Sequence, residues 1–202
     1  VERQKMLVEY EKLMHNHKMH GESQMVFWCD AEEKETVFNE WKVFTGTIQS
    51  GANKGKPSKA VRLHRNSAIV LTTRDPGSVE QQRRILGIYM VKEDFIGKLS
   101  EDGYVPAHSV YKLQLTKEES DKLLFWTYYT NKNAPDKVSW NSGKYRYFDN
   151  VWVAQILSDI MSLKEDETEK LQVKRFLSYF CKMNQLPIDE IESPSGVLAS
   201  KL

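Results

Sequence analysis

The residues best suited to chemistry in this sequence are a run of lysines and arginines with no acidic neighbour. Residues 41–74 contain seven Lys or Arg and no Asp or Glu, although the whole chain has a formal net charge of only +1. Such a concentration of positive charge attracts anions and suits a phosphate backbone. The alternative is a solvated loop that binds nothing. The predicted phosphate contacts are six of this segment's seven cations and two later arginines: Lys54, Lys56, Lys59, Arg62, Arg65, Arg74, Arg83 and Arg84.

Aromatic residues gather farther along the chain. Six Trp or Tyr fall within residues 126–147, and aromatic faces of this kind can stack on bases or form the walls of a pocket. Most of these side chains are expected in the core, with polar tips hydrogen-bonded at its edge. Trp140 is the expected exception, because its neighbours Asn141, Ser142 and Gly143 offer little apolar support. The predicted base pocket comprises Trp28, Trp126, Trp140, Asn141, Ser142 and Tyr145.

The sequence contains no complete catalytic or metal-binding signature. His15, His17 and His20 are spaced by two and three residues, which does not place all three on one face of a helix. Residues 51–56 lack the spacing of a phosphate-binding P-loop, and no helix is expected after them. We therefore expect no cofactor and no resident metal, and we assign no catalytic residue.

Two other classes of function stay open beside a nucleic-acid-binding module. One is a metal-dependent enzyme that processes nucleic acid, with acids such as Glu80, Asp94 or Asp102 holding the metal. The other is a protein-interaction domain, in which the acidic Glu165, Asp166, Glu167 and Glu169 dock a basic partner or the N-terminal helix mediates self-association. The residues favour binding over catalysis for this fragment.

Composition places the chain among folded proteins. The 202 residues are 40% hydrophobic and 11% aromatic, which argues against disorder and allows an ordinary core. Cys29 and Cys181 are too few for a disulfide framework and lie in apolar contexts, so we expect two buried thiols. The apolar runs are too short to span a bilayer and no secretory signal is visible. The expected location is cytoplasmic, with no membrane partner.

Hydrophobic periodicity and turn residues predict the elements. Helices are predicted over residues 2–19, 30–39, 117–129, 151–163 and 167–183. Strands are predicted over residues 25–29, 41–48, 68–73, 84–91 and 110–115, with brief pairing at 61–63. Gly87 indicates a bulge or a close backbone approach within its strand. Residues 50–58 are predicted to form an exposed loop, and the tail from Leu186 an extended segment or linker. A helix, then strands, then helices favours the α+β class.

The run VFWCDA, the basic loop, the hairpin SAIVLTTRDPGSVEQQRRILGIYMV and the later aromatic segment together resemble the PUA-like superfamily. That superfamily includes the EVE, YTH, ASCH and SRA domains. The resemblance covers about Met25 to Leu163. It implies a small, curved β-barrel with flanking N- and C-terminal helices that reads RNA or modified bases in DNA.

The implied organisation has three parts: an N-terminal helix at 1–22, a PUA-like β-barrel core with helices at 23–163, and a C-terminal helix and tail at 164–202. Domains of this superfamily often occur fused to nuclease or helicase modules in bacterial defence and restriction systems. The expected function is therefore a reader of DNA or RNA that recognises a modified or flipped base, with a fused or partner nuclease or helicase.

Overall fold

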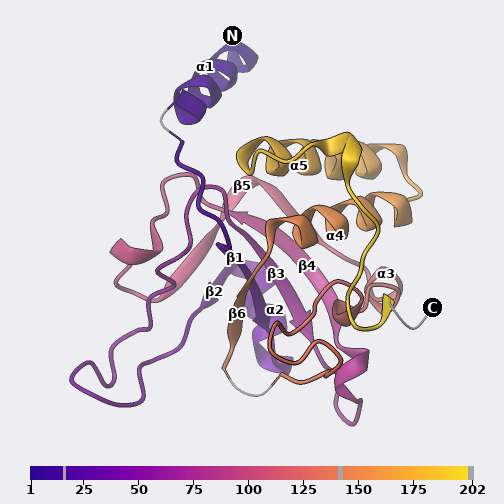
Figure 1. The fold of residues 1–202 in the computed structure, drawn as a ribbon. Coiled ribbons are helices and arrows are strands. Elements are labelled where there is room, and N and C mark those ends of the chain that lie inside the picture. Colours follow the sequence, from indigo (N-terminus) through magenta and orange to yellow (C-terminus); the bar gives the residue numbers. More distant parts are fainter. Residues whose placement is uncertain (16, 141–142, 200–202) are drawn as a thin grey trace.

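The computed structural model describes residues 1–15, 17–140 and 143–199. Its centre is a six-stranded sheet in the order β2-β5-β4-β3-β1-β6, curled into a half-barrel (Figure 1). The strands are β1 Gln24–Trp28, β2 Lys42–Phe44, β3 Ala68–Thr73, β4 Arg84–Val91, β5 Tyr104–Gln114 and β6 Tyr145–Phe148. The helices are α1 Glu2–His15, α2 Ala31–Glu40, α3 Lys117–Asp121, α4 Asn150–Leu163 and α5 Glu167–Met183. The predicted α+β class is confirmed.

Neighbouring strands pair antiparallel except β1 and β3, which run parallel. Both faces of the central strands are buried, which explains their continuous apolar sequences. Val26 and Val70 face a core formed with α4 and α5, whereas Phe27 and Leu71 face a second core that includes Val37 of α2. Figure 1 shows α4 and α5 stacked over one face of the sheet.

The predicted hairpin of β3 and β4 is confirmed, with both of its strand boundaries. The register shifts between Leu71 and Thr72, which is the irregularity that Gly87 indicated. A Cβ at Gly87 would lie 2.4 Å from the carbonyl oxygen of Leu113. The glycine is therefore required by the close approach of β5.

The helix predicted over residues 117–129 is wrong beyond Asp121. Its N-terminus is correct, because Thr116 and Glu119 form a capping box. The chain then leaves the helix so that Leu123 can accept a hydrogen bond from the backbone N–H of Ile85 and bury its side chain. A short 3-10 helix, Phe125–Thr127, follows. Pairing with β4 and burial of Phe125 outweigh local helix propensity here.

Several other elements differ from the predictions. The strand expected at 41–48 ends at Phe44, because Gly46 adopts a left-handed φ of 91° and the chain turns into the loop. Residues 61–63 form no strand, because Val61 and Arg62 lie in a turn. Strand β5 begins at Tyr104, six residues before its predicted start at residue 110. The N-terminal helix ends at His15 rather than at residue 19. The helices α4 and α5 match their predictions, and α5 does so at both ends.

The tail, predicted as an extended segment or linker, packs on the body of the protein and is therefore not a linker. The backbone N–H of Gly196 donates to the carbonyl of Thr127, and that of Leu198 donates to the carbonyl of Trp126. Val197 is 4% exposed. A Cβ at Gly196 would lie 2.5 Å from the carbonyl of Trp126, so the glycine allows this contact.

Within the described part of the chain, no helix combines the length and the apolar character that crossing a bilayer requires.

Candidate functional site

The predicted phosphate-contacting cations of residues 45–67 lie on one ordered loop between β2 and β3, called the basic loop below. Its outer half turns back on itself, because Gly51 and Gly55 adopt positive φ angles and Thr47 pairs with Pro57. The exposed cations are Lys54, Lys56, Lys59 and Arg62, and Arg65 is half-buried. The loop predicted at 50–58 is therefore confirmed, and its cations face solvent.

Strand β6 anchors the basic loop. The guanidinium of Arg62 lies 5.0 Å from the ring centre of Tyr147, and the backbone N–H of Arg62 donates to the Tyr147 hydroxyl at 3.5 Å. Ser58 and Tyr145 share a hydrogen bond between their hydroxyls at 3.4 Å. Burial raises the pKa of Tyr147, so the phenol stays neutral near neutral pH.

The other three predicted cations lie at the far end of β3. The basic loop enters β3 at Ala68, and Arg74 follows its last residue, Thr73; a strand of this length spans about 20 Å. Arg83 and Arg84 are 0% and 7% exposed. The guanidinium of Arg84 donates to Asp75 at 2.9 and 3.0 Å. Only Arg74 of these three presents an exposed guanidinium to a phosphate.

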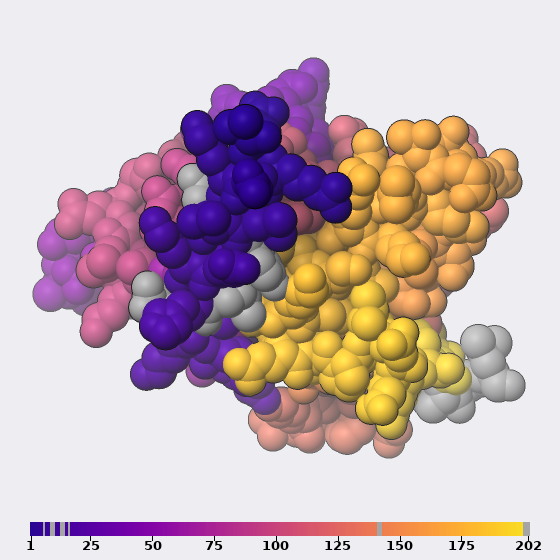
Figure 2. All heavy atoms as spheres, turned by 90° about the horizontal axis from the view of Figure 1, so that it is seen from above, coloured from indigo at the N-terminus to yellow at the C-terminus, as the bar shows by residue number. Residues whose placement is uncertain are grey.

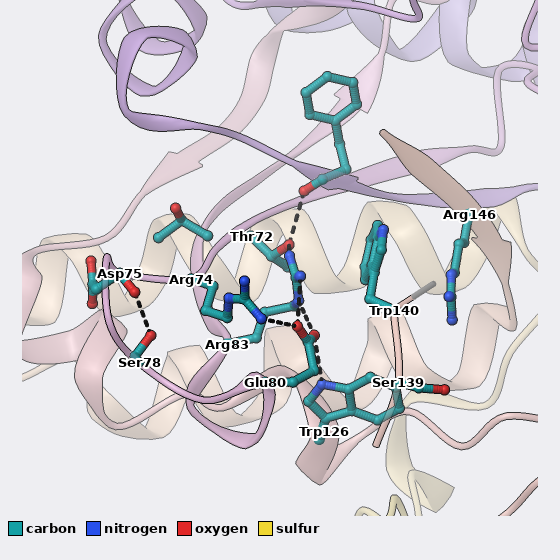
Figure 3. A network of polar contacts seen from close by, with 12 residues as sticks. Thr72, Arg74, Asp75, Ser78, Glu80, Arg83, Trp126, Ser139, Trp140 and Arg146 are labelled. Atoms are coloured by element: carbon teal, nitrogen blue, oxygen red, sulfur yellow. Dashed lines mark hydrogen bonds and ion pairs between the residues drawn. The ribbon is translucent and has the colours of Figure 1, made fainter. Parts of the chain in front are cut away.

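Glu80 organises this far end of β3 (Figure 3). Its carboxylate accepts hydrogen bonds from Arg83 at 2.5 and 3.1 Å and from the indole N–H of Trp126 at 3.1 Å. Arg74 adds a longer contact of 3.4 Å. Glu80 thereby neutralises a guanidinium that has no exposure to water, which is a structural task rather than metal binding.

Trp140 is buried, and the prediction that it lies outside the core is wrong. It is 9% exposed and donates its indole N–H to the carbonyl of Gly143 at 3.0 Å. Figure 3 shows it between Arg83 and Arg146, whose guanidinium carbons lie 4.2 and 4.9 Å from its ring centre. Its packing partners, including Phe125, are distant in sequence, so the polar local context was misleading.

The residues of the predicted base pocket do not form one cavity in the described structure. Trp28, Trp126 and Trp140 belong to the core under α4 and α5, whereas Tyr145 packs against the opposite core. Trp126 is 0% exposed and Trp28 is half-buried. Asn141 and Ser142 lie outside the described residues.

A different pocket lies between the 129–139 loop, β6 and the start of α4, and it is called the aromatic pocket below. Its volume is about 600 Å³. Its aromatic wall consists of Tyr129, Tyr147, Phe148 and Trp152, and Asn131, Lys132, Ser139 and Asp149 are among its polar lining residues. Tyr129 meets Trp152 edge-on at 5.3 Å between ring centres, and Phe148 stacks on Trp152 at 6.0 Å. Flat apolar walls with few polar groups suit a small planar ligand.

The aromatic pocket adjoins the basic loop through Tyr147, which lines the pocket and carries Arg62 on its ring. Glu22 and Lys132 form an ion pair at the pocket rim. The side chain of Arg146 donates to the Asn131 amide oxygen at 3.1 Å, which fixes the orientation of that amide. A cationic surface and an aromatic cavity are therefore contiguous on this side of the molecule.

Sequence reasoning missed Trp152 and Asn131 as pocket residues. Trp152 was assigned only to a helix, yet it stands in the first turn after the Asp149 cap, where a helix begins at the protein surface. Asn131 lies in the 129–139 loop, where its local sequence gives no signal of a pocket. Tyr129 and Tyr147 belong to the aromatic segment already noted, so the signal of the pocket was present in part.

The acids and thiols offer little chemistry. In the described ranges, no three His, Cys, Asp or Glu side chains lie close enough together to hold a metal ion. Asp102 accepts the backbone N–H of Tyr104 within its own turn. Burial raises the pKa of Cys29 to about 12 and that of Cys181 to about 11, so both remain neutral thiols near pH 7. The predicted burial of both cysteines is confirmed.

Comparison with known proteins adds no relative. Neither a protein-family model, nor a curated protein, nor a solved structure matches this chain.

Proposed function

We propose that this chain is a nucleic-acid-binding module whose basic loop contacts the phosphate backbone and whose aromatic pocket receives one unstacked base. The observation that carries the proposal is the position of Tyr147, which lines the aromatic pocket and supports Arg62 of the basic loop. A phosphate held at Arg62 would therefore stand next to the mouth of a cavity with aromatic walls.

The basic loop supplies the electrostatic part of the proposed interface. Lys54, Lys56, Lys59 and Arg62 are exposed within a stretch that contains no carboxylate. Cations that neutralise phosphates release counterions, so affinity would fall steeply as salt rises. These contacts would position the strand without reading its sequence.

The aromatic pocket supplies the proposed base contact. Tyr129 and Trp152 offer faces for stacking, and Ser139 offers a hydroxyl near them. A base inside a duplex cannot reach such a cavity, so the ligand would be single-stranded or would carry an extruded base. Stacking on one aromatic side chain contributes about 1–3 kcal/mol. The resemblance to PUA-like domains extends the proposal to a base that carries a modification.

Binding of short labelled probes tests the proposal. Fluorescence anisotropy is measured with single- and double-stranded DNA and RNA, with and without modified cytosine, across a salt series. We expect tighter binding of single strands, and a weaker salt dependence for the double variant Lys56→Ala/Lys59→Ala. The matched control is Lys122→Ala, which removes an exposed lysine at the end of α3, beside β4 and away from the basic loop.

Two outcomes would contradict the proposal. The absence of binding at low salt would show that the basic loop is only solvated. Binding that the double variant leaves unchanged would place any nucleic-acid contact elsewhere on the molecule.

A further inference from the structure

A second concave surface lies between α1, β5 and α5, on another part of the molecule. This groove has a volume of about 680 Å³. In Figure 2 the indigo α1 borders the orange-to-yellow surface of the C-terminal helices. The groove is lined by Arg3 and Leu7 of α1, Ser109, Val110 and Tyr111 of β5, and Leu171, Lys174, Arg175, Ser178 and Lys182 of α5, among others.

One stripe of α5 forms a long wall of this groove. Leu171, Arg175, Ser178 and Lys182 follow each other at helical spacing along one face. The residues that α5 buries in the core, such as Val173, lie on a different face. From residue 171 to residue 182 the helix rises about 16 Å, which equals about three turns of a second helix laid beside it.

The groove exposes aliphatic side chains from three separate elements. Leu7 is 53% exposed, Val110 is 58% exposed and Leu171 is 47% exposed. Single exposed aliphatic residues are ordinary, but three that line one concavity form a patch of the kind that partner proteins cover. Aliphatic groups do not stack on bases, so this patch favours a protein ligand over a nucleic acid.

Among the described residues that line the groove, the charges are mainly positive. Arg3, Lys174, Arg175 and Lys182 line it, and all four side chains are exposed. Among the described residues of the same lining, the acidic one is Glu93, and His108 Nε2 lies 2.6 Å from its carboxylate. His108 Nδ1 accepts the backbone N–H of Val110 at 2.9 Å, so Nε2 carries the hydrogen that is donated to Glu93.

We propose that this groove docks an amphipathic helix of a partner protein whose polar face is acidic. Leucine-like side chains of that helix would cover Leu7, Val110 and Leu171. Its carboxylates would meet Arg3 of α1 and Lys174 and Arg175 of α5. Helices bind grooves of this kind through anchors at i, i+3 or i+4, and i+7. The surface is distinct from the basic loop and the aromatic pocket, so the proposal does not depend on nucleic-acid binding.

A pair of designed peptides tests the docking proposal on the full chain. The acidic probe is a labelled helical peptide of about 16 residues, with Leu at every third or fourth position and Glu at the positions between. The second probe has the same Leu pattern with Lys in place of Glu. We expect the acidic probe to bind at least about tenfold more tightly than the Lys probe, as measured by anisotropy.

Two variants locate the binding. The charge reversal Lys174→Glu/Arg175→Glu should weaken binding of the acidic probe by about tenfold or more. Leu171→Glu should weaken it similarly, because it removes an apolar contact and adds a like charge. All three side chains are exposed, so the fold tolerates these changes, and unchanged circular dichroism melting verifies this. Lys98→Glu reverses a single charge outside the groove; it is the control for position and should bind as the wild type does.

Amide chemical shifts of the labelled protein provide the second readout. Addition of the acidic probe should perturb the backbone amides of Val110, Leu171 and Ser178. Equal binding of the two peptides would overturn the proposal, and so would the absence of binding or wild-type affinity of the charge-reversed variant. Shifts confined to the basic loop would also overturn it, because the peptide would then occupy the proposed nucleic-acid surface.

Discussion

Two regions of this protein combine arginine with aromatic rings, and they differ in exposure to water. At one end of β3, Arg62 lies on the ring of Tyr147 and remains exposed. At the other end, Arg83 lies 4.8 Å from the ring centre of Trp28 and 4.2 Å from that of Trp140, with no exposed surface. Sequence alone predicted the same phosphate-binding role for both arginines.

The difference in exposure decides what each arginine can do. A guanidinium over an aromatic ring at the surface gains about 0.5–1 kcal/mol and stays available to an anion. A guanidinium that is fully desolvated needs a counterion at hand, and Glu80 supplies it to Arg83 at 2.5 Å. Arg62 on Tyr147 is therefore suited to binding an anion, whereas Arg83 with Glu80 stabilises the fold.

The largest expected effect comes from removing the buried ion pair between Arg83 and Glu80. Arg83→Ala leaves the Glu80 carboxylate, whose side chain is only 14% exposed, without its main partner. Loss of one member of a buried ion pair costs about 3–5 kcal/mol. We expect a decrease of that size in the free energy of unfolding, measured by urea denaturation.

Arg74→Ala is the matched control for that experiment. Arg74 contacts the same carboxylate at 3.4 Å, but its side chain is 39% exposed. Exposed ion pairs contribute about 0–1 kcal/mol, so this variant should unfold nearly as the wild type does. Equal destabilisation by the two substitutions would show that burial of the arginine does not determine its contribution to stability.

The next effect concerns the aromatic pocket, which lies beside Arg62. Trp152→Leu keeps an apolar side chain at the pocket wall but removes the stacking face. We expect the binding free energy for single strands to weaken by about 1–3 kcal/mol, or roughly fivefold to 150-fold in affinity, as measured by anisotropy. Trp41→Leu is the aromatic control, because Trp41 packs with Phe38 in the other core, away from the pocket. Equal losses of affinity in both variants would place the base contact outside the aromatic pocket.

A smaller effect, on the salt dependence of binding, is expected from Arg62 itself. Arg62→Ala removes one cation, so the slope of log affinity against log salt should decrease by about one. Base preference should be unchanged, because phosphate contacts carry no sequence information. Urea denaturation should detect little change in stability. An unchanged slope would show that Arg62 contacts no phosphate.

The fold was predictable where local pattern and burial agree. The limits of β3, β4 and α5 follow directly from apolar runs and periodicity, because these residues are buried by the same faces that the patterns define. The helix expected through Tyr129 failed because Leu123 pairs with β4, a contact that no local pattern encodes. The tail failed for the same reason, since its partners are the backbones of Trp126 and Thr127.

The candidate site was harder to predict than the fold, because exposure is set by tertiary contacts. Nothing in the residues next to Trp140 indicates that Phe125 and two guanidinium groups surround its ring. Conversely, the side chains of Trp152 and Asn131 become pocket walls only when α4 and the 129–139 loop are placed beside β6. A basic run can be recognised in a sequence, but the part of it that faces solvent cannot.

The smallest expected effect is a dependence of stability on pH, and it comes from two histidines beside the basic loop. His20 and His64 stack at 3.5 Å between ring centres, and this contact joins the N-terminal segment to the basic loop. Burial lowers the pKa of both rings from the ordinary value of 6.5, and the neighbouring cation Lys18 lowers both further. The unfolded chain therefore binds protons more readily than the folded chain does. Stability should fall as the pH drops below about 6.5, and it should be fully present above that value.

Urea denaturation at pH 7.5 and at pH 5.5 measures this effect, with His64→Gln as the variant and His15→Gln as the control. We expect the decrease between the two pH values to be smaller in His64→Gln than in the wild type, because one of the two titrating rings is gone. The control should keep the wild-type decrease. If His64→Gln has the same pH dependence as the wild type, other groups are responsible for it. The regions around Arg62 and Arg83 would then differ only in their exposure to water, and the contact between His20 and His64 would not titrate with folding.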